Sequence, residues 1–452
     1  MTATIERTGS GVGLLAVLMP AVLITVIASD MVNLMLPSIG AEFGAAEAEL
    51  AWVVTGFLLV FAVGIPIYGR VSDRVGLRQL FGLALLAYAA GSLMCALAPD
   101  LLVLVLGRIA MGVGAAAIPV LSVIAITRLL PADRRGTAIG VVSAAAGIGA
   151  AAGPALGGGV GQFLGWRALF WFMAVVVLVL LPAAWRALPA AAPAGGTGFD
   201  LLGGILLGAG AGFVLFGATQ AQVAGLAALP AWGSFLASAV AIALFGWRTV
   251  RAAQPFVPPS LFANRVYRIA VLVTFLAMAV NLGGLVFVPL LLVDVNGLEP
   301  GTGALVMIPA GIAVAALSPL IGRIADRIGT RLLVLTGLAI MVLSAAFLAA
   351  ARSVVPTAAG ILGLSIGFIL VLTPIINAAA GALPPEQVGI GMGILQGAQF
   401  LGAGTGPALF GVLLAARQQH IGAEAAFSQV FLAMAVVAVL ALVAAARMRP
   451  ER

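Results

Sequence analysis

The chain has 452 residues, of which 63% are hydrophobic and only 8% are charged. Soluble globular domains carry about 25% charged and about 45–50% apolar residues, so this composition excludes a water-soluble fold. The formal charge of +7 comes from arginines without any lysine, and they lie mostly in short gaps between apolar stretches. That distribution is typical of cytoplasmic loops and not of a nucleic-acid-binding patch. A single cysteine, Cys95, and a single histidine, His420, exclude a disulfide framework and a thiolate or histidine metal site.

We expect an all-α membrane protein, because a spanning segment must satisfy its own backbone hydrogen bonds. A spanning helix needs roughly 20 mostly apolar residues. The run after Glu6 and Arg7 has no cleavage site, so we interpret it as the first span and not as a removed signal peptide. Charges, prolines and glycines mark the gaps and predict fourteen spans, at residues 12–36, 48–69, 78–98, 101–129, 135–160, 166–188, 199–222, 229–250, 266–293, 301–322, 330–350, 355–380, 387–416 and 425–447.

The arginines orient these spans. With both termini in the cytoplasm, every arginine lies on the cytoplasmic side except Arg108, which is within a span, and Arg167, Arg352 and Arg417, which are outside. This bias predicts a multi-pass protein of the bacterial inner membrane with both termini cytoplasmic.

The two halves of the chain are similar at one fixed offset of 253 residues. Residues 69–78, GRVSDRVGLR, match residues 322–331, GRIADRIGTR. The same offset aligns two further pairs of segments, 130–136 with 383–389 and 153–156 with 406–409. Three matches without a gap indicate a duplicated unit.

If each copy has six helices, the offset leaves room for two more between them. The sequence therefore predicts an N-terminal six-helix bundle at 1–188, a linker with two inserted helices at 189–258, and a C-terminal six-helix bundle at 259–452. Repeated halves in parallel orientation are a known transporter architecture, with the substrate site between them near the bilayer midplane.

Three motifs resemble those of the major facilitator superfamily. The loop at 69–78 is similar to its most diagnostic signature, Arg108 with the small residues at 112–116 is similar to its second motif, and residues 149–158 resemble the motif associated with exporters. The chain looks most similar to the fourteen-helix drug:proton antiporters, and among these to the tetracycline-efflux pumps. This resemblance, which covers nearly the whole chain, implies export of small molecules in exchange for protons. We expect a monomer with no nucleic-acid partner, driven by the proton gradient without a cofactor.

The loop between the second and third predicted spans is a candidate gate. Its glycines allow a tight turn, and an aspartate flanked by arginines can form a cytoplasmic charge latch. The alternative is that these charges only anchor the loop on the inner face, but their repetition favours the latch. The resemblance implies a gate that breaks when the cytoplasmic side opens. The candidate residues are Gly69, Arg70, Asp73, Arg74, Gly76 and Arg78.

The fifth predicted span carries glycines four residues apart on one face, which allows another helix to approach closely. They are Gly149, Gly153 and Gly157. Ordinary tight packing is one interpretation. A gating role is the other, because Pro154 interrupts the helical hydrogen bonding and lets the helix bend.

Asp30 is the one acidic residue well inside a predicted span. An intramembrane carboxyl group is a functional hypothesis by default, and hydrocarbon favours its neutral form, which suits a reversible proton carrier. A structural aspartate open to an outer vestibule is the alternative. The family's first-helix acid stands nine residues before the proline, where this chain has Ala28, whereas Asp30 stands seven before Pro37. The resemblance implies that Arg108 pairs with a carboxylate or assists proton release, and snorkelling is the alternative.

Amides within the spans are candidates for a substrate cavity. An apolar cavity with a few polar groups suits an amphiphilic drug, whereas ordinary interhelical hydrogen bonding is the alternative. The candidates are Asn281, Asn377, Gln396 and Gln399 in the C-terminal half, with Asn33 and the aromatic Phe57 in the N-terminal half.

These features together predict proton-coupled export of an amphiphilic compound, tetracycline-like or broader. A lipid, an endogenous metabolite or a self-made antibiotic would share every one of them. A membrane-bound enzyme would need a nucleophile with its base or a metal cluster, and this composition does not favour either. A receptor would predict an attached soluble domain or a long loop, which these residues do not suggest.

Overall fold

The computed structural model describes residues 11–45, 47–72, 74–190, 200–225, 228–298 and 305–448, and these are helical apart from short connections. The chain divides into two compact units. Unit 1 comprises Met1–Pro131, Val141–Gly198 and Pro385–Gly393, and unit 2 comprises Ala132–Gly140, Phe199–Pro384 and Ile394–Arg452. Each unit is built mainly from one repeat, but it also includes the start of one long helix from the other repeat.

The first repeat begins with two helices that a short 3-10 segment joins. Glycine in the left-handed region, at Gly165 (φ 79°), allows the sharp turn into its last helix. Its elements are α1 (Gly11–Asp30), η1 (Met31–Met35), α2 (Leu36–Phe43), α3 (Glu47–Val71), α4 (Leu77–Ala96), α5 (Leu101–Leu129), α6 (Ala132–Leu164) and α7 (Trp166–Ala187).

The second repeat follows an inserted helix pair. The pair is α8 (Leu201–Ala224) and α9 (Leu229–Arg251), and the short α10 (Ser260–Ala263) leads into the repeat. The repeat itself consists of α11 (Arg265–Asp294), α13 (Ile308–Ile328), α14 (Thr330–Ala350), α15 (Val354–Gly381), η2 (Pro385–Gln387), α16 (Val388–Ile421) and α17 (Ala423–Ala446).

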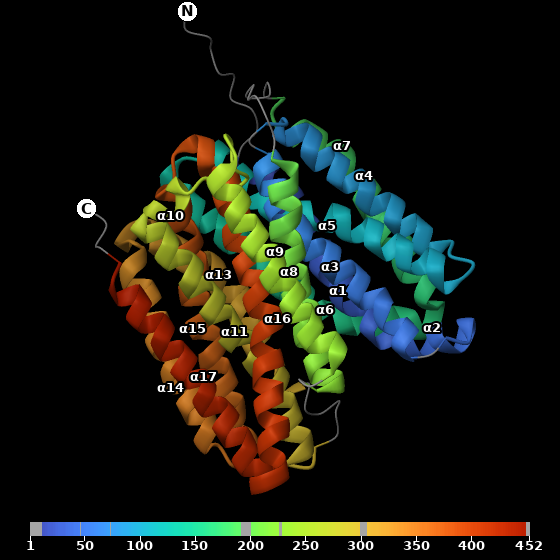
Figure 1. Ribbon diagram of the computed structural model, residues 1–452, viewed down its shortest axis with the longest axis vertical. Coiled ribbons are helices and arrows are strands. Elements are labelled where there is room, and N and C mark those ends of the chain that lie inside the picture. The colour runs from blue at the N-terminus through green and yellow to red at the C-terminus, as the bar shows by residue number, and fades with distance from the viewer. Residues whose placement is uncertain are drawn as a thin grey trace, which may run out of the picture. The chain divides into compact units, whose positions relative to one another are not determined.

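The two repeats pack their helices in the same pattern. In the first, α4 packs against α5 and α7, α3 against α5, and α1 against α7 and α5. In the second, α14 packs against α15 and α17, α13 against α15, and α11 against α17 and α15, as Figure 1 shows for α14, α15 and α17. The duplication seen in three short sequence segments is therefore a duplication of the packing.

Equivalent glycines make equivalent close approaches. A β-carbon on Gly114 of α5 would lie 2.4 Å from the carbonyl oxygen of Ala84 on α4. A β-carbon on Gly367 of α15 would lie 2.7 Å from the carbonyl oxygen of Gly337 on α14. The two pairs are 253 residues apart at both positions, so each repeat joins these two helices backbone to backbone at the same point.

The predicted all-α membrane fold is confirmed. Within the described residues, thirteen helices are long and apolar enough to cross a membrane. The 33-residue helix α6 covers the remaining predicted span, 135–160, although the side chains of 150–152 and 154–162 lie outside the described residues.

The first predicted span, 12–36, is wrong at its end. The α-helix stops at Asp30, and the chain tightens into the 3-10 segment η1 before α2 begins at Leu36. The residues of η1 are as apolar as those before them, so hydropathy alone gave no signal of this change.

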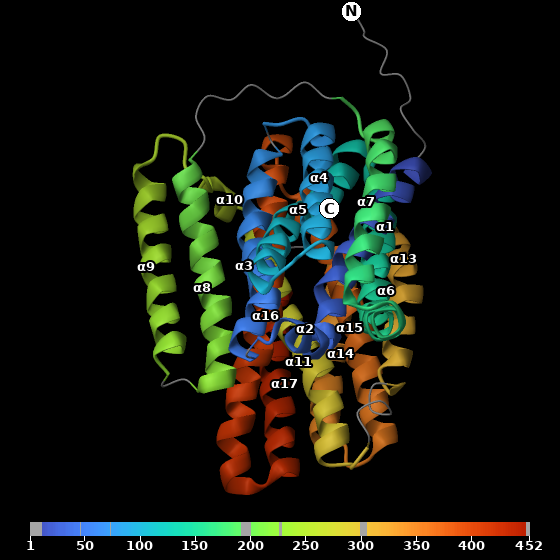
Figure 2. The same cartoon turned by 90° about the vertical axis from the view of Figure 1, so that its right-hand side faces the viewer.

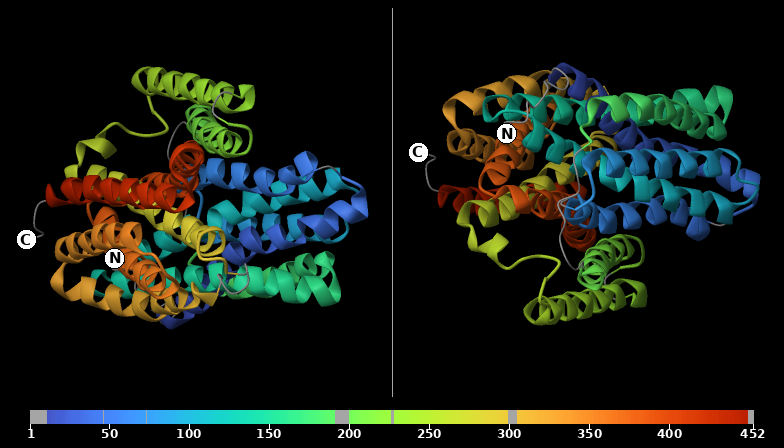
Figure 3. Two further views of the ribbon diagram at one scale, coloured as in Figure 1. Left: turned by 90° about the horizontal axis from the view of Figure 1, so that it is seen from below. Right: turned by 90° about the horizontal axis from the view of Figure 1, so that it is seen from above.

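The inserted helices α8 and α9 run side by side as a hairpin, shown in green in Figures 2 and 3. Both belong to unit 2, and their contacts with that unit are described below.

Candidate functional site

The most buried charge in the described residues is Arg108 of α5, whose side chain is 0% exposed. Its Nε donates a hydrogen bond to the carbonyl of Val53 on α3 (3.0 Å), and its Nη1 donates to the carbonyl of Ala28 on α1 (3.1 Å). The ring of Phe57 lies 4.3 Å from the guanidinium carbon, a cation–π distance. Arg108 therefore joins α5 to α1 and α3 inside unit 1, and it does not snorkel to an interface.

The position of this guanidinium follows from where α1 ends. The last carbonyls of an α-helix lack donors within the helix and carry its partial negative charge. Ala28 is in the last turn of α1, and the hydrogen bond from Arg108 satisfies its carbonyl. Asp30 is the last residue of this same turn, and its side chain lies outside the described residues. The side chain of Arg108 thus contacts the backbone of α1 two residues before Asp30.

A buried tyrosine that the sequence analysis did not identify contacts α1 from another helix. The hydroxyl of Tyr88 on α4 donates to the carbonyl of Ile24 on α1 (3.4 Å) and lies 3.7 Å from the sulfur of Met173. Tyr88 is 0% exposed. A lone tyrosine in an apolar run could have been flagged as a residue in need of a buried partner.

The glycines of α6 bring that helix to α1. A β-carbon on Gly149 would lie 2.9 Å from the carbonyl oxygen of Leu23, two turns before Asp30. Gly153 is also buried. Pro154 and Gly157 lie in the part of α6 where side chains are outside the described residues, and the helix runs through both.

The candidate gate contains a close approach between the backbones of α3 and α16 in unit 1. A β-carbon on Gly69, near the end of α3, would lie 2.6 Å from the carbonyl oxygen of Gly389 and 2.8 Å from the Cα of Gly393, both on α16. In unit 2, a β-carbon on Gly322 of α13 would lie 2.2 Å from the carbonyl oxygen of Gly136 on α6. The 253 offset relates Gly69 to Gly322 and Gly136 to Gly389, so the two contacts are reciprocal.

A second reciprocal contact lies one turn away. A β-carbon on Gly393 would lie 3.2 Å from the carbonyl oxygen of Ile65, and one on Gly140 would lie 2.3 Å from the carbonyl oxygen of Ser318. We name these two contacts in each unit the glycine seam. Because backbone meets backbone there, any larger side chain would separate the helices.

Two arginines interact with the ends of helices near the glycine seam. Arg128 donates to the carbonyl of Ser72 (3.0 Å), and the hydroxyl of Ser72 donates to the carbonyl of Gly69 (2.7 Å). The guanidinium of Arg78 lies 4.6 Å above the ring of Trp185 on α7. These contacts satisfy carbonyls at the end of α3 and tie α4 to α7.

The remaining loop candidates are placed less completely. Gly76 is buried and begins α4 as its N-cap residue. Arg70 and Arg74 are half-buried. Asp73, the centre of the predicted latch, lies outside the described residues, so the latch stays a prediction.

The amide candidates of the second half all belong to unit 2. Asn281 is buried on α11 at 7% exposure, and Asn377 is half-buried on α15, which packs against α11. Gln396, at 5% exposure, and the half-buried Gln399 lie on α16. The side chain of Asn33 in η1 lies outside the described residues. Phe57, also predicted to line a substrate cavity, is 1% exposed and lies against Arg108.

The arrangement of two like-packed six-helix repeats matches a known family. The family model of the Major Facilitator Superfamily matches residues 18–377 and, separately, residues 270–452. The chain belongs to the Major Facilitator Superfamily. It is therefore a multi-pass inner-membrane protein of a family of small-molecule transporters, which are not enzymes.

Two relatives in the superfamily are named for drug resistance. "Multidrug resistance protein Stp" of Mycobacterium tuberculosis is 30% identical over 418 residues, covering 92% of this chain and 76% of the relative. "Lincomycin resistance protein LmrB" of Listeria monocytogenes is 26% identical over 316 residues, covering 70% and 67%.

Solved structures of superfamily members share the fold. The human organic anion transporter MFSD10 (TETRAN) gives a TM-score of 0.70 at 16% identity, covering 97% of this chain and 100% of that one. The proton:xylose symporter XylE gives 0.69 at 16% identity, covering 96% and 94%. At this identity the likeness concerns the fold alone.

A polar lock holds the inserted pair to the second repeat of this superfamily member. Oδ1 of Asp200 accepts hydrogen bonds from the N–H of Gly203 (2.9 Å) and from Nε of Arg248 at the end of α9 (2.5 Å). Its Oδ2 accepts from the N–H of Phe256, just before α10 (3.3 Å). The carboxylate therefore caps α8 and ties both helices of the pair to the segment that leads into α11.

The electrostatics of this lock favour the ionised form of Asp200. Burial raises its pKa, but the hydrogen bond from Arg248, followed by those from the backbone of Gly203 and Phe256, outweighs burial, so the pKa lies below its ordinary value. The sequence analysis did not pair Asp200 with Arg248. The sequence did contain a signal that could have predicted the pair. An aspartate directly precedes one apolar run and an arginine is near the end of the next, and in a helical hairpin these two ends lie on the same side.

Proposed function

We propose that this chain exports amphiphilic small molecules from the cytoplasm in exchange for protons, by alternating access. The observation that carries the proposal is the fully buried Arg108, hydrogen-bonded to the last turn of α1 where Asp30 stands. A buried charge of this kind is costly in a membrane and marks ion and proton pathways. The relatives named for multidrug and lincomycin resistance support drugs as the substrate class.

In the proposed cycle, Asp30 carries the proton. The neutral form is favoured while hydrocarbon surrounds the carboxyl group, and a nearby guanidinium favours the ionised form. Arg108 is anchored to the carbonyls of α1 and α3 and not to a mobile loop, so its charge stays beside the end of α1. A small movement of α1 against α5 would then change the balance and release the proton.

The glycine seam and the loop around Asp73 form the proposed cytoplasmic gate. Backbone-to-backbone contacts at Gly69 and Gly322 allow close approach without side chains that must rearrange. We further propose a monomer with both termini in the cytoplasm, powered by the proton gradient without a cofactor.

The decisive experiment replaces Asp30 by asparagine. Asp30→Asn keeps the size and removes the titratable proton, so the protein should still insert in the membrane while substrate-driven proton release from everted vesicles is lost. Asp294→Asn makes the same chemical change at the exposed end of α11 and should leave exchange unchanged. Proton-for-substrate exchange at the normal rate in Asp30→Asn vesicles would contradict the proposed carrier.

A resistance panel tests the substrate class. An efflux-deficient host that expresses the chain should survive higher concentrations of at least one of three classes: tetracyclines, lipophilic cations and lincomycin. The Arg108→Gln variant is the matched control, because it lacks the buried guanidinium and is expected to insert in the membrane, which an immunoblot of the membrane fraction checks. Unchanged susceptibility to all three classes would contradict drug export and favour another exported compound.

A further inference from the structure

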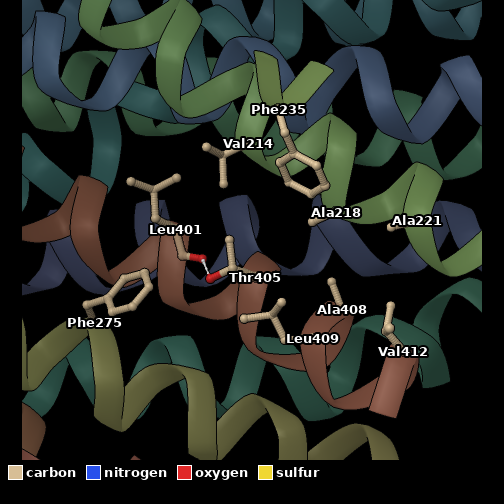
Figure 4. Close-up of a pocket in the computed structure, with 10 residues that line it drawn as sticks. All are labelled: Val214, Ala218, Ala221, Phe235, Phe275, Leu401, Thr405, Ala408, Leu409 and Val412. Carbon is tan, nitrogen blue, oxygen red and sulfur yellow. Dashed lines mark hydrogen bonds between the residues drawn. The ribbon is translucent and has the colours of Figure 1, made fainter. Parts of the chain in front are cut away.

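A cavity of about 370 Å³ lies within unit 2, between the inserted pair and the second repeat. Its walls are residues between Val214 and Ala221 of α8 and between Leu401 and Val412 of α16, with Phe235 of α9 and Phe275 of α11 (Figure 4). This volume lies in the range of small-molecule sites.

The cavity is lined almost entirely by hydrocarbon. Among its described lining residues, Thr405 has the only polar side chain, and its hydroxyl donates to the carbonyl of Leu401 within the same helix (2.6 Å, dashed in Figure 4). A buried water needs two to four polar partners, which this lining does not offer. The lining therefore selects a hydrocarbon occupant over water.

Small residues create the space. The helices touch directly beside the cavity, where a β-carbon on Gly404 would lie 2.1 Å from a methyl group of Leu215. Along the cavity wall, Ala218 and Ala408 leave a gap that larger side chains would fill, and both are buried at 4% and 3% exposure.

The cavity is continuous with the surface that the bilayer covers. Leu409 lines the cavity and is nevertheless 65% exposed, so the cavity opens where this residue stands. Large apolar side chains next in sequence to lining residues are also exposed, among them Phe213 beside Val214 on α8 and Leu236 beside Phe235 on α9. In a multi-pass membrane protein, such a surface is in contact with lipid chains.

The dimensions match one leaflet. From Leu401 to Val412, α16 rises about 16 Å at 1.5 Å per residue, and half of a roughly 30 Å hydrocarbon core is about 15 Å. Arg417 stands five residues beyond Val412, about 8 Å further along the axis. It is exposed, and among the described residues it forms no ion pair. A phosphate group would lie at this level.

We propose that this cavity binds one acyl chain of a phospholipid, taken from the leaflet at the C-terminal end of α16, with the phosphate group at the level of Arg417. The acyl chain would fill the space between the inserted helix pair and the second repeat. This space lies toward the end of the pair that is away from the Asp200 lock. The proposal does not depend on the transported substrate.

Photo-crosslinking tests it on the full chain. The purified protein is placed in phosphatidylethanolamine vesicles that contain phosphatidylglycerol with a diazirine in the middle of one acyl chain, and labelled residues are mapped by peptide mass spectrometry. We expect labelling at Ala218, Thr405 and Ala408, which are nearly buried and line the cavity. Labelling confined to exposed lipid-facing residues would overturn the proposal.

Filling the cavity provides the matched comparison. Ala218→Phe should lower labelling at Thr405 and Ala408 several-fold, whereas Ala239→Phe, the same change on the exposed face of α9, should not change it. Ala221→Leu is a smaller filling variant with the same expected direction. Unchanged labelling in both filling variants would overturn the proposal.

Two further measurements test whether the hydrocarbon in the cavity comes from a phospholipid or from the transported drug. Arg417→Gln should lower labelling by the phosphatidylglycerol probe several-fold and leave labelling by a diacylglycerol with the same chain unchanged. A saturating transported drug should not displace the probe. Displacement by the drug would overturn the lipid assignment and make the cavity a substrate site.

Discussion

The centre of unit 1 and its counterpart in unit 2 have the same helix packing, but the first contains a buried charge and the second is apolar. In unit 1, α1 ends at Asp30 against the buried guanidinium of Arg108. At the 253 offset these residues correspond to Gly283 of α11 and Ile361 of α15, both buried. A β-carbon on Gly283 would lie 2.7 Å from the terminal methyl group of Met434 and 2.9 Å from the ring of Phe410, so a side chain at this position would displace them.

The comparison shows that the duplication has kept the close helix contacts in both repeats but the buried charge in only one. The glycine seam and the close approaches of the third and fourth helices of each repeat recur at matching positions, because both repeats need the same helix distances. The buried charge does not recur, because it requires desolvation and adds nothing to packing that an isoleucine would not supply. The proposal of proton coupling therefore concerns unit 1 alone, and the following changes test this difference between the units.

The largest effect should come from making unit 1 resemble unit 2. Arg108→Ile removes the hydrogen bonds to the carbonyls of Val53 and Ala28, each worth about 1.5–3 kcal/mol for a charged donor, and removes the buried charge beside the end of α1. We expect inserted protein without drug efflux, measured as fluorescent-substrate efflux from cells. Ile361→Val, a small change at the matching position, should retain most of the efflux. Normal efflux by Arg108→Ile would show that the two centres are functionally alike.

The next effect should be equal in both repeats. Gly69→Ala and Gly322→Ala each place a methyl group against a backbone oxygen of the facing helix, and overpacking of this kind costs about 1–3 kcal/mol. We expect several-fold slower efflux and lower thermal stability for both variants. Gly246→Ala on α9 is the control, because a β-carbon there meets nothing within 4 Å. An effect of only one of the two seam glycines would contradict a reciprocal seam.

The smallest effect concerns the opposite end of the two units. In unit 1, Glu42 accepts hydrogen bonds from Arg167 and from Nε1 of Trp166 at the start of α7. In unit 2, Arg352 pairs with Glu424 near the start of α17 (2.9 Å). Unit 1 thus ties the end of α2 to the start of its last helix, and unit 2 ties the connection between α14 and α15 to the start of its last helix.

Acid should weaken the tie in unit 1. The hydrogen bond from Arg167, followed by that from Trp166, holds the pKa of Glu42 below its ordinary value of 4.5. A lowered pKa in the folded state stabilises the protein above pH 4.5, and this contribution is lost as the pH falls through the folded pKa. Glu42→Gln should lower the melting temperature slightly at pH 7, since partly exposed pairs contribute about 0.2–1 kcal/mol.

The melting difference between wild type and Glu42→Gln should then shrink as the pH is lowered past 4.5. Trp166→Phe removes one of the two donors but also changes a buried ring that packs against Phe43 and Phe170, so only the pH-dependent part of its melting difference should be smaller than that of Glu42→Gln. A difference that stays constant with pH would show that the ion pair contributes nothing that titrates.

Hydropathy and the internal repeat were sufficient to predict the all-α fold, because each span must bury its backbone within itself. The depth of Arg108 in its span also indicated a buried charge. Its acceptors could not be predicted, because the carbonyls of Ala28 and Val53 have no side-chain signature. The interpretation of Phe57 as part of a substrate cavity rested on residue type, and its place against Arg108 depends on which face of α3 meets α5.

Contacts between segments far apart in the sequence could not be predicted either. Asp200 and Arg248 are 48 residues apart and meet only because α8 and α9 form a hairpin. The seam pairs Gly69 with Gly389, and the repeat shows that both are glycines without showing that they face each other.

Each unit includes a short segment of the other repeat, and this has a consequence for the order in which the helices can pack during synthesis. Unit 1 includes Pro385–Gly393, although the rest of it ends at Gly198. At roughly 5–20 residues per second, a ribosome takes about 10–40 s to make the intervening stretch. During that time the Gly69 face of α3 has no α16 to pack against. The N-terminal helices must therefore wait in the bilayer, incompletely packed, until the chain is almost finished, and a ribosome stalled before residue 385 would leave them in that state.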